Sequence, residues 1–360
     1  MRILIDALCA EFGGIRTYVE QLLGRWAATY PADDVHVVLR AGSTIATPGL
    51  TRHELAVRGP DVVGRPWAQA TKMHRLEHHL RPDVVLATAP TTDVRRTQAP
   101  LAVTILDLRA EILPGEFSRG RRLLRAASYG RTYHLAEGFL SISQRSLDDL
   151  HRLHPATRTK HGAAVLLGAD HVLDWPDPTR SGPAIGFAHH SNKNPQLLID
   201  AWALARQRGV VVPALTLLGV PAALRDELSE QIAERGLQGS VELAGFLPDE
   251  EFQAVLAAAE LIAFPSSFEG FGLPIVEGMH LGKPVVIGPD PGCLEVAGGH
   301  GWVATDWTAP ALADAIAGAA GATSAHIDAA RAWAAHFTWD RTVRQTRAAL
   351  ETIALEGRTT

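Results

Sequence analysis

The sequence is poor in cysteine, with only Cys9 and Cys293 among its 360 residues. Their separation fits neither a metal-binding nor a redox motif, so we expect two reduced thiols and no disulfide. Long hydrophobic runs are also missing, and residues 1–6 end on an aspartate before a signal-peptide core could form. These absences predict a cytoplasmic protein without a membrane span.

An excess of basic residues is missing as well. The formal net charge is −5, from 34 Lys and Arg against 39 Asp and Glu, which argues against a general affinity for nucleic acid. The hydrophobic share of 46% and the charged share of 20% are those of a globular protein. A chain of this length can form two domains, each with its own core.

Short strand-like runs alternate with helical patterns along the chain, which predicts parallel sheets covered by helices. Five runs lie in the first half, at residues 3–6, 35–39, 84–87, 102–106 and 139–142, and six lie in the second, at residues 184–188, 214–218, 241–244, 261–264, 285–287 and 301–303. Each set predicts one Rossmann-like unit. Residues 174–183 between them are rich in proline and polar side chains, which is typical of a linker.

A glycine-rich turn follows the run at residues 261–264 and carries Glu269 and Glu277, eight positions apart. Glycines between the two glutamates leave backbone N–H groups accessible, and a proline suits the first turn of the next helix, where phosphate is attracted. Glu277 would lie about one turn into that helix, where its carboxylate could accept hydrogen bonds from a ribose diol. The pattern predicts a site for a phosphorylated sugar or nucleotide.

Two other loops follow strands in the same way. Gly13 and Gly14 open an amphipathic helix and would let the backbone close on a ligand, although a simple tight turn explains them equally well. Lys193 precedes a helix in the second half and suits a phosphate group, the alternative being a solvent-exposed lysine. No intact G-x-G-x-x-G motif occurs, which disfavours a nicotinamide dehydrogenase.

The phrase from Glu269 to Glu277, E-G-F-G-L-P-x-x-E, followed by G-K-P-V-V, resembles the signature of family 4 glycosyltransferases. The resemblance implies an α/β chain of GT-B architecture, with two Rossmann-like domains facing each other across a cleft. It implies an acceptor domain at 1–174, a nucleotide-sugar donor domain at 184–336, and a helix at 337–360 that crosses back to the first domain.

The activity implied by this resemblance is transfer of a sugar from a nucleotide-diphosphate sugar to an acceptor hydroxyl or amine, with retention of anomeric configuration. The predicted catalytic residues are Glu269, Lys193 and Asp107. The predicted donor-binding residues are Gly13, Gly14, His189, His190, Lys193, Phe246, Leu247, Glu269, Gly270, Phe271, Gly272, Leu273 and Glu277. The nucleotide sugar is a co-substrate, so we expect neither a tightly bound cofactor nor a required metal.

Near Lys193 the chain departs from the family pattern. Many relatives have Gly-Arg or Pro-Arg in this region, whereas residues 187–188 are Phe-Ala and residues 191–192 are Ser-Asn. One expected cation is therefore missing. His189 or His190 could replace it by donating to phosphate, although neighbouring loop histidines are as often exposed or packed.

A second departure precedes Asp107, where Leu106 replaces the usual histidine. In relatives that histidine contacts the transferred sugar, so its absence leaves the identity or the pose of the sugar open. Asp107 itself could equally be a helix cap or a turn residue. Phe246 and Leu247 would border the nucleobase, but packing explains them almost as well.

Two other functions stay open. One is a different GT-B enzyme, such as a sugar phosphorylase or nucleotide-sugar epimerase, and the other is a nonenzymatic subunit that binds nucleotide sugars. The acceptor could be a small molecule, a glycan or a lipid-linked molecule. Peripheral contact with an anionic membrane is a less favoured option that rests on a basic cluster, for which a solvated surface is the commoner explanation. The cluster comprises Arg119, Arg121, Arg122, Arg125 and Arg131.

Overall fold

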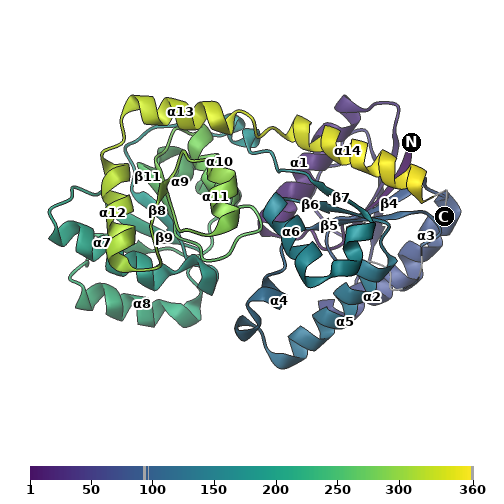
Figure 1. The fold of residues 1–360 in the computed structure, drawn as a ribbon, viewed down its shortest axis with the longest axis horizontal. Coiled ribbons are helices and arrows are strands. Elements are labelled where there is room, and N and C mark those ends of the chain that lie inside the picture. Colours follow the sequence, from purple (N-terminus) through teal and green to yellow (C-terminus); the bar gives the residue numbers. More distant parts are fainter. Residues whose placement is uncertain (92–94, 96, 358–360) are drawn as a thin grey trace. The chain divides into compact units, whose positions relative to one another are not determined.

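The computed structural model describes residues 1–91, 95 and 97–357 of the chain. The chain divides into two compact units, each built around its own parallel sheet (Figure 1). Unit 1 comprises Met1–Gly168 and Trp339–Thr360, and unit 2 comprises Ala169–Thr338. The α/β class predicted from the alternating sequence pattern is thereby confirmed.

The sheet of unit 1 has seven parallel strands in the order β3-β2-β1-β4-β5-β6-β7. They are β1 (Arg2–Asp6), β2 (Asp34–Arg40), β3 (Thr51–Leu55), β4 (Val84–Ala87), β5 (Leu101–Ile105), β6 (Gly138–Ser141) and β7 (His161–Ala164). Strands β3 and β7 were not predicted from the sequence. Both lie at sheet edges and consist mostly of polar or small side chains, T-R-H-E-L and H-G-A-A, and not of the apolar run that a buried parallel strand shows.

Helices connect these strands. They are α1 (Gly13–Thr29), α2 (Asp61–Ala68), the π-helical turn η1 (Gln69–Met73), α3 (His74–Leu80), α4 (Arg109–Ile112), η2 (Pro114–Glu116), α5 (Arg119–Leu135), α6 (Gln144–Leu153), η3 (Pro155–Thr159) and α14 (Trp339–Glu356). Helix α14 lies beside α1, and Arg347 Nε donates to Asp33 Oδ2 at 2.8 Å. The last helix of the chain is thus part of unit 1.

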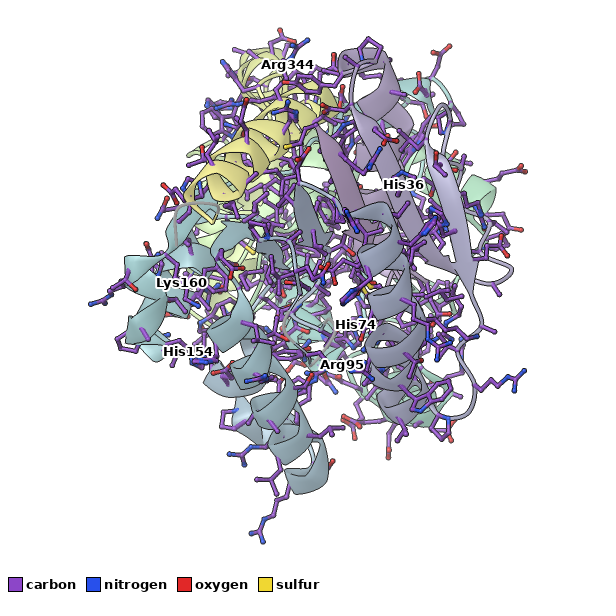
Figure 2. The ribbon with its side chains drawn as sticks, turned by 90° about the vertical axis from the view of Figure 1, so that its right-hand side faces the viewer. His36, His74, Arg95, His154, Lys160 and Arg344 are labelled. Carbon is purple, nitrogen blue, oxygen red and sulfur yellow. The ribbon has the colours of Figure 1, made fainter. Side chains whose placement is uncertain are left out.

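Lysine 160 closes the C-terminal end of α5. The side chain of Lys160, labelled in Figure 2, donates through Nζ to the carbonyl oxygens of Tyr133, His134 and Ala136, at 3.0, 2.8 and 2.6 Å. These carbonyls have no partner inside the helix, and a cation also suits the negative end of the helix dipole. The contact fixes α5 at the end opposite its arginine-rich start.

The sheet of unit 2 has six parallel strands in the order β10-β9-β8-β11-β12-β13. They are β8 (Ala184–Phe187), β9 (Leu215–Leu218), β10 (Val241–Leu243), β11 (Leu261–Phe264), β12 (Val285–Ile287) and β13 (Trp302–Val303). All six correspond to predicted runs. The order reverses between β8 and β11, so their carboxyl ends form the switch point at which open α/β sheets bind ligands.

The helical segments of unit 2 complete its two layers. They are η4 (Asp170–Asp174), η5 (Ser191–Lys193), α7 (Pro195–Gln207), α8 (Ala222–Glu234), α9 (Asp249–Ala258), α10 (Leu273–His280), α11 (Pro291–Ala297), α12 (Ala309–Ala320) and α13 (Ser324–Ala334). Helix α7 packs on α12 and buries Trp202 completely, together with Leu217 of β9. This apolar core supports the loops at the carboxyl ends of the strands.

The proline-rich segment at 174–183 packs on unit 2. Thr179 N donates to the carbonyl of Ala257 at 2.9 Å, and Lys283 Nζ donates to the carbonyls of Thr179 and Ala257. Lys283 is 1% exposed, so this contact is internal to the unit. The domain ranges 1–174, 184–336 and 337–360 stay predictions about which parts fold independently.

Candidate donor-binding site

The candidate site of unit 2 lies where β8 and β11 end. The loop after β8 contains η5 and leads into α7, while the loop after β11 leads into α10. One residue in each loop has a left-handed backbone conformation, which lets the chain turn sharply into the next helix. Asn194 has φ 51° before Pro195 opens α7, and Gly272 has φ 96° before α10. A Cβ on Gly272 would lie 3.0 Å from the Ile275 side chain, so glycine is needed there.

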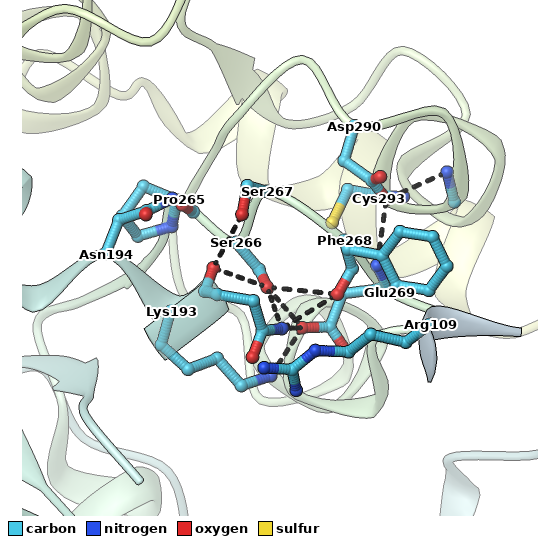
Figure 3. Close-up of polar contacts among 12 residues, drawn as sticks. Arg109, Lys193, Asn194, Pro265, Ser266, Ser267, Phe268, Glu269, Asp290 and Cys293 are labelled. Atoms are coloured by element: carbon cyan, nitrogen blue, oxygen red, sulfur yellow. Dashed lines mark hydrogen bonds and ion pairs between the residues drawn. The ribbon is translucent and has the colours of Figure 1, made fainter. Parts of the chain in front are cut away.

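Lys193 and Glu269 form a mostly buried ion pair between these loops. Lys193 Nζ lies 2.5 Å from Glu269 Oε1, and the two side chains are 8% and 15% exposed (Figure 3). The ammonium also lies 4.2 Å from the ring centre of Phe264. A buried pair with good geometry fixes both side chains, so the two residues that the sequence analysis selected are brought together.

The same carboxylate oxygen accepts two further hydrogen bonds. Asn192 Nδ2 donates to Glu269 Oε1 at 3.1 Å, and Ser266 Oγ donates to the same atom. Asn192 Nδ2 also lies 2.9 Å from Ser266 Oγ and 2.8 Å from the carbonyl oxygen of Phe268. Asn192 and Ser266 are buried, and together with Lys193 they orient the carboxylate firmly.

Neither neutral member of this network was predicted from the sequence. The departure from the family pattern at residues 191–192 was the available signal for Asn192, whose amide donates to Glu269. The only signal for Ser266 in the sequence is its position just after a strand, and many structural serines share that position.

The loop that carries Glu269 is held from a third side. Asp290 Oδ2 accepts hydrogen bonds from the backbone N–H groups of Glu269, Gly292 and Cys293, at 3.2, 3.0 and 3.1 Å. Phe271, within the predicted donor-binding run, is 2% exposed and packs its ring 6.0 Å from that of Phe337. The side chain of Phe271 therefore belongs to the core, and only its backbone is available to a ligand.

Glu277 lies on α10 and is 5% exposed. Its carboxylate Oε1 lies 3.3 Å from Nε2 of His171, a residue of η4. The helical placement of Glu277 agrees with its expected position one turn after the proline. The histidine contact has no local signal in the sequence, because the two residues are more than one hundred positions apart.

His189, His190 and Phe246 lie close together in the loops that follow β8 and β10. The His189 ring lies 4.9 Å from that of His190 and 6.5 Å from that of Phe246, between centroids. His190 and Phe246 are exposed, whereas His189 and Leu247 are half-buried. Exposed aromatic rings next to imidazoles can stack on a planar group and donate to an anion.

Gly13, Gly14 and Asp107 belong to unit 1. Gly13 has φ 64°, and both glycines are exposed at the start of α1, after the carboxyl end of β1. Asp107 follows β5 and is exposed, and its Oδ1 accepts a hydrogen bond from Arg109 N at 2.9 Å. This local bond is the turn-forming role that the sequence analysis weighed against a catalytic one.

In the described part of the chain, no group of three or more His, Cys, Asp or Glu side chains could hold a metal ion. No helix there is both long and apolar enough to cross a membrane.

Residues 183–320 match the family described as glycosyl transferases group 1. Among curated relatives, O-antigen chain mannosyltransferase B of Escherichia coli is 37% identical over 113 residues, which cover 31% of this chain and 29% of that protein. D-inositol 3-phosphate glycosyltransferase of Jonesia denitrificans is 32% identical over 173 residues, 44% of this chain and 40% of that protein. The matched segments thus span less than half the length of these relatives.

The solved structures resemble the whole chain. HepE of Anabaena, in complex with UDP and glucose, has a TM-score of 0.74 and 20% identity, with 98% of this chain and 99% of that chain covered. WaaG, a glycosyltransferase involved in lipopolysaccharide biosynthesis, has a TM-score of 0.68 and 15% identity, with 97% and 98% covered. At these identities the likeness establishes the fold. The chain therefore has the GT-B fold, and its residues 183–320 are similar to the group 1 glycosyl transferases.

Proposed function

We propose that this protein transfers a sugar from a nucleotide-diphosphate sugar to an acceptor hydroxyl or amine, with retention of anomeric configuration. The observation that carries the proposal is the buried Lys193–Glu269 pair, 2.5 Å apart, at the switch point of unit 2. It lies within the segment that matches the family. A fixed cation beside a fixed carboxylate suits a reaction in which a diphosphate leaves and the sugar gains positive charge.

Each side chain has a role in this proposal. Lys193 would stabilise the departing diphosphate, and Glu269 would accept hydrogen bonds from sugar hydroxyls or oppose the developing positive charge. Backbone N–H groups of residues 270–273 would bind phosphate at the start of α10, and Glu277 would accept from the ribose diol. Protein groups in this scheme position and stabilise the reactants, so no covalent role for Glu269 is required.

The residues around the site add three assignments to the proposal. His189 or His190 would supply the second positive partner of the diphosphate, because one cation expected from the family pattern is missing near Lys193. Phe246 and Leu247 would border the nucleobase. Gly13, Gly14 and Asp107 of unit 1 would contact the donor phosphates and the acceptor.

The direct test is hydrolysis and transfer with purified protein. UDP-, GDP-, ADP- and dTDP-sugars are incubated with and without candidate acceptors, and release of nucleoside diphosphate is followed together with the anomeric proton of the product by NMR. We expect slow hydrolysis of at least one donor, faster release with a productive acceptor, a product that retains configuration, and loss of turnover in Glu269→Ala.

Other outcomes would assign a rival function. Tight donor binding without turnover for every acceptor would favour a nonenzymatic subunit. Release of a sugar phosphate, or epimerisation without an acceptor, would favour another GT-B enzyme. Unchanged turnover in EDTA is expected because we propose no required metal. The cytoplasmic location and the lack of nucleic-acid binding stay predictions.

A further inference from the structure

We propose that His171 is a positioning residue that aims the Glu277 carboxylate at the ribose of the donor nucleotide. The inference rests on the proposed function, in which Glu277 binds the ribose diol. His171 Nε2 lies 3.3 Å from Glu277 Oε1, and the two side chains are 7% and 6% exposed. Because the pair is enclosed, the position of one group limits the position of the other.

The imidazole is itself held in place. The His171 ring packs edge-on against Trp175, with 5.5 Å between centroids and 82° between planes, and Trp175 packs edge-on against Phe252 of α9 at 6.0 Å. The start of η4 is fixed by a hydrogen bond from Ala169 N to the carbonyl of Phe337, at 3.0 Å. An imidazole packed on a ring that is itself packed has few alternative rotamers.

Glu277 depends on this contact. A buried carboxylate without a partner is strongly destabilising. Within the residues that the structure describes, no side chain other than His171 forms an ion pair or hydrogen bond with this carboxylate. The nearby His280, one turn later on α10, is a poor substitute, because burial lowers the pKa of its imidazole and favours the neutral form.

The pairing leaves capacity for a ligand. A carboxylate has about four acceptor positions on its two oxygens, and the single His171 nitrogen at 3.3 Å would occupy one of them. The remaining positions suit a vicinal diol, which offers two O–H donors. His171 would therefore fix the carboxylate without competing with the ribose.

The test uses two loss variants, one rescue variant and one control. His171→Phe keeps an aromatic edge toward Trp175 but removes Nε2, and His171→Asn is polar but too short to reach Glu277. His171→Gln places an amide N–H near the former Nε2. His280→Asn changes the other imidazole near Glu277 and serves as the matched control. Thermal unfolding first establishes which variants fold.

Dissociation constants are measured by calorimetry for UDP, GDP and ADP, each against its 2′,3′-dideoxy analogue. In the wild type we expect loss of the hydroxyls to weaken binding about tenfold to a hundredfold, as for hydrogen bonds to a charged group. In His171→Phe and His171→Asn that ratio should fall to about threefold or less, with the affinity for the dideoxy analogue unchanged. His171→Gln and His280→Asn should keep most of the wild-type ratio.

The donor KM should rise in the two loss variants with little change in kcat, because ribose binding is equal in the ground and transition states. A wild-type ratio in either folded loss variant would overturn the inference. Failure of the wild-type protein to bind any of the three ribonucleotides would instead contradict the proposed function, so the two failures are distinguishable.

Discussion

The candidate donor site of unit 2 and the basic surface of unit 1 use their charges differently. Lys193 is 8% exposed and paired at 2.5 Å, and its carboxylate partner accepts two further hydrogen bonds. In unit 1, Arg119 and Arg122 are exposed and line a pocket of about 390 Å³ between α4 and α5. Neither arginine has an ion-pair partner among the described residues.

The basic surface also departs from the usual helix design. Helix α5 begins with arginines and has no acidic residue in its first turn, although the positive end of the helix dipole disfavours cations there. Leu123 is 74% exposed, and the guanidinium of Arg125 lies 4.8 Å from the Phe117 ring centre. The side chain of Arg121 lies outside the described part of the chain. Buried, paired charge can hold one group in one geometry, whereas exposed, unpaired charge can attract varied anions.

The largest effect should come from removing the buried cation. Lys193→Ala leaves the Glu269 carboxylate buried without its cation and removes the stabiliser of the diphosphate, so we expect kcat/KM to fall about tenfold to a thousandfold. Steady-state kinetics with the best donor measures this. Arg122→Ala, which removes an exposed cation, is the matched control and should keep donor hydrolysis within about twofold. Near-normal turnover in Lys193→Ala would remove this lysine from the site.

Removing the neutral side chain Asn192 should lower kcat/KM less than removing Lys193. Asn192→Ala removes an amide that bonds Ser266, Phe268 and Glu269, and we expect a loss of about 1–3 kcal/mol in stability. Donor kcat/KM should fall about tenfold, because the orientation of Glu269 is less restricted. Urea denaturation and kinetics measure the two quantities. If neither changes, the network does not orient the carboxylate.

The sequence predicted the parts of this arrangement that repeat locally. Strand and helix periodicity identified both sheets, and the glycines and Pro274 located Glu269 and Glu277 after a buried strand. Edge strands β3 and β7 were missed because half-exposed strands lack an apolar run. Ser266 and His171 were missed for another reason. Ser266 bonds Asn192, and His171 contacts Glu277. Both partners lie far away in the sequence, and hydrophobic periodicity does not predict such contacts.

A second buried lysine offers a comparison within unit 2. Lys283 donates to carbonyl oxygens and has no carboxylate partner among the described residues, and burial lowers the pKa of its ammonium from 10.5 to about 8. The unfolded chain then binds more protons than the folded chain between these values, so stability should rise with pH in this window. At pH values below the pKa of the folded protein, Lys283 stays charged in the folded state, and the full free-energy cost of burying that charge is present.

Chemical denaturation from pH 8 to pH 9 tests this comparison. The unfolding free energy of the wild type should increase by about 1 kcal/mol relative to that of Lys283→Met, which cancels the contribution of other titrating groups. Parallel pH profiles for the wild type and Lys283→Met would mean that the two carbonyls suffice to keep the ammonium charged.

The smallest effect should follow from the double change Arg119→Ala and Arg122→Ala. Because both side chains are exposed and have no ion-pair partner within the part of the chain that the structure describes, their removal should change stability by less than about 0.5 kcal/mol and leave donor hydrolysis intact. Any consequence should be confined to acceptor-dependent transfer or to sedimentation with anionic vesicles at low salt, where each lost arginine would weaken binding by about 1 kcal/mol. Failure of the wild type to sediment with such vesicles would exclude membrane contact and leave an anionic acceptor as the use of this surface. A loss of donor hydrolysis in the double variant would break the comparison, because it would mean that the exposed cations serve the same step as Lys193.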